Sequence, residues 1–192
     1  MKINERLHLV VPIYSTGEDT ATPIAFVHSA PLTREAFEAH FLLLSKTFAA
    51  IYSEGLGEIA GPRVASLILR EVSKKNRHEE SHRSLMNEIR RLSNVALKRP
   101  EGWVTVPFQE AIDQSLLDDE DLAEVENAIV FFIVASSMLQ RRTAAEMLPG
   151  AATLWGAQIS SHDFTAFAAS LPTSNAIANT GESRKLGSSV AY

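Results

Sequence analysis

The chain of 192 residues contains no cysteine. Disulfide frameworks, thiolate zinc sites, iron–sulfur clusters and cysteine nucleophiles are therefore excluded. Positive charge is not in excess either, because 18 Lys and Arg stand against 23 Asp and Glu, which gives a formal net charge of -5. Proteins that coat nucleic acid without selectivity depend on surplus cations. We therefore expect no nucleic-acid partner.

The sequence also lacks a long apolar run. Its most apolar window, residues 128–139, covers about a dozen positions, whereas a membrane-spanning helix needs roughly 20. The N-terminus shows neither the longer apolar stretch nor the small-residue cleavage site of a signal peptide. These absences predict a cytoplasmic protein with no membrane partner.

Motifs of cofactor and nucleophile chemistry are missing as well, since no G-x-G-x-x-G, P-loop or G-x-S-x-G pattern is present. One metal pattern does occur. His78-Glu79-x-x-His82 matches H-E-x-x-H, in which two imidazoles on one helical face bind zinc and the Glu acts as base. Its neighbours are polar and basic, which disfavours a dication. A zinc hydrolase is thus the least favoured alternative, and we expect a protein that is not an enzyme and has no cofactor.

The N-terminal part predicts a β-hairpin. Residues 7–14 and 23–28 are rich in β-branched and aromatic side chains, and the residues between them, 15–20, have the composition of a turn. Pro12 cannot donate a ladder hydrogen bond, which restricts its strand to an edge of a sheet.

After the hairpin the apolar period becomes helical. The clearest helix has Thr33 as its N-cap and Gly55 as its stop signal. A second helix begins at Gly61-Pro62, because proline suits the first helical position. A third covers residues 85–95. The apolar face of the first helix contains Phe37, Phe41, Leu44, Phe48 and Ile51.

Residues 103–107 predict a short extended segment, and 108–117 a fourth helix. Asp118 or Asp119 caps a fifth helix, whose residues 129–134 are apolar on every face and should lie at the centre of the core. Pro149-Gly150 breaks the chain, and one or two short helices follow within 151–167.

Together these elements predict a mainly α protein. Residues 1–171 form one helix-rich domain with an N-terminal β-hairpin, an α+β arrangement in detail. Residues 172–192 are mostly small and polar with little to bury, and they predict a flexible, disordered tail.

Charge is unevenly distributed along the chain. Residues 70–99 contain nine Lys or Arg and four Glu, and residues 101–126 contain nine acids and no Lys or Arg. The favoured interpretation is two solvated faces that attract each other within the fold. The alternative is a polarised surface that docks a partner or orders a homo-oligomer by electrostatic steering.

Seven stretches carry a resemblance to a known family: residues 31–37, 61–65, 87–92, 102–107, 124–132, 154–159 and 167–174. They resemble tail proteins of long-tailed bacteriophages, in particular the tail assembly chaperones that are counterparts of the lambda-type G protein. The resemblance implies a viral protein of virion morphogenesis that acts in the host cytoplasm. It would bind the tape measure protein, recruit tail tube protein, and leave before the tail is complete.

The resemblance carries over no catalytic residue. It also implies a longer product made by programmed frameshifting. The alternative within the same context is a structural tail or head–tail component, which would remain in the virion tail.

A chaperone for an amphipathic helix needs an apolar groove with adaptable side chains at its edge. Each candidate can equally be an ordinary core residue, which is the commoner case. The candidate partner-binding residues are Met138, Met147, Leu154 and Trp155, together with Met86.

Overall fold

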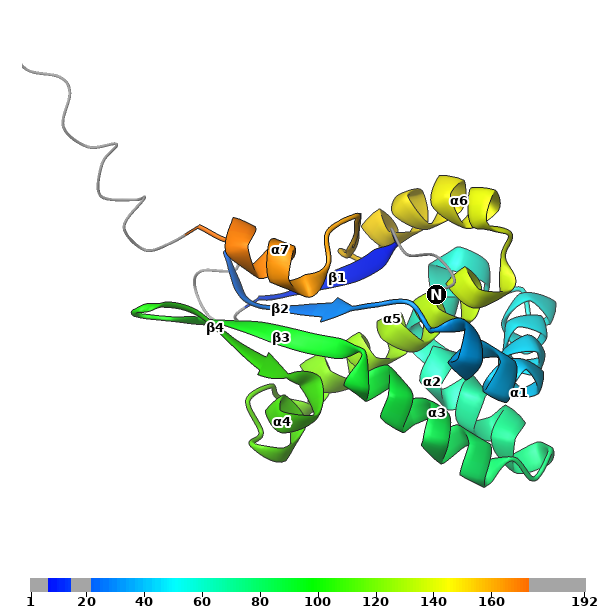
Figure 1. The fold of residues 1–192 in the computed structure, drawn as a ribbon. Coiled ribbons are helices and arrows are strands. Elements are labelled where there is room, and N and C mark those ends of the chain that lie inside the picture. The colour runs from blue at the N-terminus through cyan, green and yellow to red at the C-terminus, as the bar shows by residue number, and fades with distance from the viewer. Residues whose placement is uncertain (1–6, 15–21, 173–192) are drawn as a thin grey trace, which may run out of the picture.

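The computed structural model describes residues 7–14 and 22–172, in which seven helices accompany a five-stranded antiparallel sheet (Figure 1). The fold is mixed α+β. The predicted turn at 15–20 and residues 173–192 of the predicted tail lie outside the described residues. The strands are β1 (His8–Tyr14), β2 (Pro23–Ser29), β3 (Ser93–Arg99), β4 (Gly102–Pro107) and β5 (Gln158–Ser160). The helices are α1 (Arg34–Ser53), α2 (Gly57–Lys75), α3 (Glu79–Arg91), α4 (Phe108–Asp113), α5 (Asp119–Met138), α6 (Arg141–Leu154) and α7 (Phe164–Ser170).

The predicted hairpin is confirmed, and it forms the middle of a larger sheet. The strand order is β4-β3-β2-β1-β5, so β2 also pairs with β3, and β1 with β5. Strand β5 pairs only with residues His8 to Val10 of β1. Within the described residues, Pro12 of β1 therefore pairs with β2 on one side and has no partner strand on the other. Proline has no N–H to donate, and at Pro12 the strand is locally an edge strand, as predicted.

The extended segment predicted at 103–107 is confirmed as β4, but the helix predicted over 85–95 is wrong at its end. Helix α3 stops at Arg91, and Val95 lies in β3, opposite Val27 of β2 and Val106 of β4. Val95 fits the helical period of the preceding residues, and a short apolar run is ambiguous between helix and strand.

Different helices cover the two faces of the sheet. In Figure 1, α7 lies on one side of the strands, and α3, α4 and α5 lie on the other. Leu9, Val11 and Ile13 of β1 belong to the main core on the helical side. There α5 contributes residues 129–134, which are buried on every face as predicted. Asp118 is the cap, since its carboxylate accepts a hydrogen bond from the N–H of Asp121.

Helix α2 begins at Gly57, four residues before the predicted start, and Pro62 lies inside it. A proline at this position has no N–H to donate to the carbonyl of Glu58, one turn back. The indole Nε1 of Trp155 donates to that carbonyl instead, at 3.0 Å. The proline is tolerated because a side chain from the end of α6 supplies the missing donor.

The close approach of Phe131 explains why a glycine, Gly61, precedes this proline. A Cβ at Gly61 would lie 2.7 Å from Cε2 of Phe131 in α5. Phe131 in turn meets Trp155 edge-on, with ring centroids 5.3 Å apart. Helices α2 and α5 and the end of α6 therefore meet at these side chains.

The break predicted at Pro149-Gly150 is also wrong, because both residues lie inside α6. Leu148 and Ala152 on either side are buried, and this packing holds the helix together across the proline. The following segment forms β5 and α7 rather than helices alone, and α4 is shorter than the predicted helix over 108–117.

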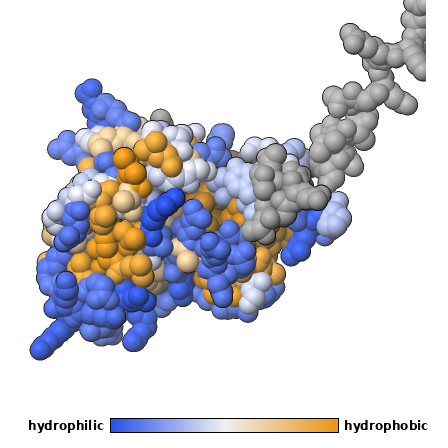
Figure 2. Space-filling model, turned by 180° about the vertical axis from the view of Figure 1, so that it is seen from behind, coloured by the Kyte–Doolittle hydropathy of each residue, from blue (hydrophilic) through white to orange (hydrophobic). Residues whose placement is uncertain are grey.

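Some apolar side chains remain outside the core. Thr33 and Gly55 bound α1 as predicted, but Phe41 of its expected apolar face is 48% exposed, while His40 beside it is buried. Viewed from behind, the surface shows two apolar areas divided by polar side chains (Figure 2). Over the described ranges, no helix combines the length and the apolarity that a bilayer crossing requires.

We expect Gly61→Ala to destabilise the protein by about 1–3 kcal/mol, because the added methyl group overpacks the α2–α5 contact. Gly150→Ala is the matched control. It lies in α6 with no atom within 4 Å of its Cβ position, and there alanine should be neutral or stabilising by up to about 1 kcal/mol. Denaturant unfolding measures both, and equal effects would contradict the packing argument.

We expect Trp155→Phe to cost about 1–3 kcal/mol, because it leaves the Glu58 carbonyl without its donor. In a Pro62→Ala background the backbone N–H gained at position 62 can take over that bond, so the same change should cost about 1 kcal/mol less. A double-mutant cycle by chemical denaturation measures the difference. Identical costs in both backgrounds would refute this role of the indole.

Candidate functional site

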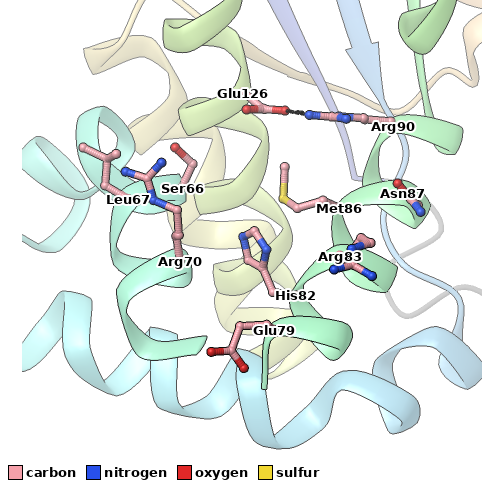
Figure 3. Close-up of a pocket in the computed structure, with 10 residues that line it drawn as sticks. All are labelled: Ser66, Leu67, Arg70, Glu79, His82, Arg83, Met86, Asn87, Arg90 and Glu126. Atoms are coloured by element: carbon pink, nitrogen blue, oxygen red, sulfur yellow. Dashed lines mark hydrogen bonds and ion pairs between the residues drawn. The ribbon is translucent and has the colours of Figure 1, made fainter. Parts of the chain in front are cut away.

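A pocket of about 390 Å³ lies between α2 and α3 and reaches α5 (Figure 3). Helix α2 contributes the left wall in Figure 3 and α3 the right wall, with Met86 and His82 between them. The lining residues are Ser66, Leu67, Arg70, Glu79, His82, Arg83, Met86, Asn87, Arg90 and Glu126.

The pocket contains the ion pair that connects the two oppositely charged segments. Nη2 of Arg90 lies 2.8 Å from Oε1 of Glu126, and Nε of the same arginine also donates to that oxygen. This bond fits the favoured interpretation of the charge pattern, attraction within the fold. Other ion pairs in the described residues join side chains of the same helix, as between Arg91 and Glu88.

His82 lies in the same pocket and is half-buried. Burial lowers the pKa of its imidazole, and the nearby Arg70 and Arg90 lower it further against the opposing effect of Glu126. Burial and the neighbouring arginines therefore both favour the neutral form of this imidazole.

The structure separates the residues of the H-E-x-x-H pattern. Glu79 and His82 line the pocket, whereas His78 is the N-cap residue of α3, with φ -112° and ψ 30°. Within residues 7–14 and 22–172, no three His, Asp or Glu side chains are grouped so that they could share a metal ion.

The predicted partner-binding residues fall into three kinds. Met86 is buried and belongs to the main core. Met138 and Trp155 are partly buried and pack against the main core. Met147 and Leu154 of α6 are exposed, at 39% and 67%. Ile59 was not among the predicted residues, although it is 78% exposed in the first turn of α2. It stands two residues before the predicted start of that helix at Gly61 and therefore gave no sign of lying on a helix surface.

A second hollow, of about 320 Å³, lies beside Trp155. Its acidic lining residues, Asp121 and Glu124, come from the first turns of α5. Burial and the carboxylates of Asp118, Glu124 and Glu120 raise the pKa of Asp121. The hollow thus combines apolar walls with an acidic side. Its lining residues are Val11, Pro12, Ile13, Tyr14, Asp121, Glu124, Val125, Trp155 and Gly156.

Two buried histidines lie under α7, on the other face of the sheet. The rings of His8 and His28 are 5.0 Å apart, and Nε2 of His28 donates to the carbonyl of His162 at 3.1 Å. Phe164 and Phe167 of α7 each lie 5.6 Å from the ring of His28. Sequence reasoning missed this cluster because it brings together residues from both ends of the chain.

Searches against protein-family models, curated proteins and solved structures find no significant match to this chain.

Burial, with a smaller contribution from the neighbouring His8, lowers the pKa of His28 from 6.5 to about 4, although the hydrogen bond to the His162 carbonyl acts in the opposite direction. The unfolded chain therefore binds this proton more tightly, so stability should be full above pH 6.5 and fall as the pH drops toward 4. We expect His28→Phe to flatten this decline, which is on the order of 3 kcal/mol. His162→Ala is the control, since its backbone carbonyl remains. Unfolding free energies measured across this pH range would contradict the assignment if both variants behaved alike.

Proposed function

We propose that the protein is a non-enzymatic tail assembly chaperone of a long-tailed bacteriophage, which binds the tape measure protein in the host cytoplasm and recruits tail tube subunits. The observation that carries this proposal is the apolar surface at the end of α6 and the start of α2, where Leu154 and Ile59 are 67% and 78% exposed. The family resemblance of the sequence supports the same function.

The indole bond brings close together the backbone segments that carry these two side chains. Trp155 donates to the carbonyl of Glu58, and Leu154 and Ile59 are their immediate neighbours in the chain. Burying side chains of this size against a partner is favourable by about 1.5–3 kcal/mol each. Met147, also exposed on α6, adds an adaptable side chain that suits partners of varied sequence.

The hollow beside Trp155 suits an apolar side chain of a partner rather than a whole helix. An amphipathic helix presents such side chains at i, i+3, i+4 and i+7 along one face. The lining residues Val11, Ile13 and Val125 are themselves buried. Asp121 and Glu124 on the same hollow favour a partner with Lys or Arg flanking its apolar face.

The test is co-expression with the tape measure protein. We expect the wild-type chain to raise the soluble fraction of that protein and to co-purify with it. The double variant Ile59→Asp/Leu154→Asp should lose most of this effect, because it places charges in the apolar contact. Val104→Asp is the matched control, an exposed apolar residue of β4 at the opposite edge of the sheet from β5.

Two results would count against the proposal. One is equal behaviour of the wild type, the double variant and the control in co-purification. The other is recovery of the chain in stoichiometric amounts from purified virions, which would instead establish a structural tail or head–tail component.

A further inference from the structure

The pocket between α2 and α3 contains two arginines, Arg70 and Arg83, that form no ion pair within the described part of the chain. Arg90 is neutralised by Glu126, and outside this pocket Arg91 pairs with Glu88. Arg70 and Arg83 line the pocket, and no described Asp or Glu forms an ion pair with either of them. The pocket therefore has positive charge available for a ligand.

The two arginines stand on opposite walls. Figure 3 shows Arg70 extending from α2 and Arg83 from α3, on either side of His82. The apolar lining of the same pocket comes from Leu67, which is exposed, and from Met86, which is largely buried. A ligand that fits must combine a negative group with an apolar one.

The charges of the pocket act on His82. Burial has the largest effect in lowering the pKa of its imidazole, Arg70 and Arg90 lower it further, and Glu126 opposes them. An anion placed between the walls would oppose these cations and raise that pKa again.

We propose that this pocket binds the carboxylate of an acidic side chain from a partner protein, with a neighbouring apolar side chain of the same segment on Leu67 and Met86. The apolar surface beside the arginines favours the carboxylate of a side chain within a peptide segment over a free phosphate group, which has no apolar part to place on that surface. Arginine also binds carboxylates through paired N–H donors. This site does not depend on the apolar surface around Leu154.

The experiment uses the full chain and three probes: the capped dipeptide N-acetyl-leucylglutamate amide, its leucylglutamine analogue, and inorganic phosphate. NMR follows the His82 imidazole through a pH titration and the Met86 methyl group through a ligand titration. We expect the glutamate dipeptide to raise the pKa of His82, shift the Met86 methyl signal, and bind about tenfold more tightly than the uncharged analogue.

Variants then assign the binding to the two arginines. Arg70→Gln and Arg83→Gln should each weaken binding of the glutamate dipeptide by about tenfold. Both side chains are exposed, so the fold should persist. Arg142→Gln is the matched control, because it removes the same charge from an exposed arginine of α6 outside the pocket. It should leave binding unchanged.

Three results would overturn the proposal. The first is an unchanged His82 titration at millimolar dipeptide. The second is equal affinity for the glutamate and glutamine dipeptides, or an equal loss in the Arg142 control. The third is tighter binding of phosphate than of the glutamate dipeptide, which would mark a general anion site rather than one for an acidic side chain.

Discussion

The close approach of α2 to α5 is the constraint on which the helical layer depends. Gly61 leaves room for the ring of Phe131, and a methyl group in its place would overlap that ring. The proline that follows removes a backbone donor, and Trp155 replaces it at the carbonyl of Glu58. Close packing and backbone hydrogen bonding are thus satisfied together, by residues from α2 and α5 and by Trp155, which follows α6.

This arrangement decides which side chains remain for a partner. The indole of Trp155 is committed at its nitrogen to Glu58 and at its ring to Phe131. It can form a wall of the neighbouring hollow, but its polar group is not available to a ligand. Leu154, the preceding residue, is left on the surface by the same geometry. The inward position of Trp155 is thus accompanied by the exposure of Leu154.

Local signals in the sequence were sufficient for the ends of several elements, since the caps Thr33 and Asp118 act on N–H groups three residues away. Local signals failed where a residue distant in the chain determines the secondary structure. Pro62 was expected to open a helix because its partner Trp155 is remote in the chain, and Val95 was assigned to a helix because its partner strands were unseen. The α2–α3 pocket could not be predicted from the sequence for the same reason, although the H-E-x-x-H pattern contains two of its residues, Glu79 and His82.

Helix α2 contributes both to the apolar surface around Ile59 and Leu154 and to the α2–α3 pocket. Ile59 and Arg70 are eleven positions apart in α2, which is close to three full turns, so they lie on nearly the same stripe about 16 Å apart. Because Gly61 and Pro62 fix the start of this helix against α5, that spacing is rigid. A partner helix lying along α2 could reach both sites if its acidic residue stood about three turns from its apolar contact. Binding at both would then select for register as well as for composition.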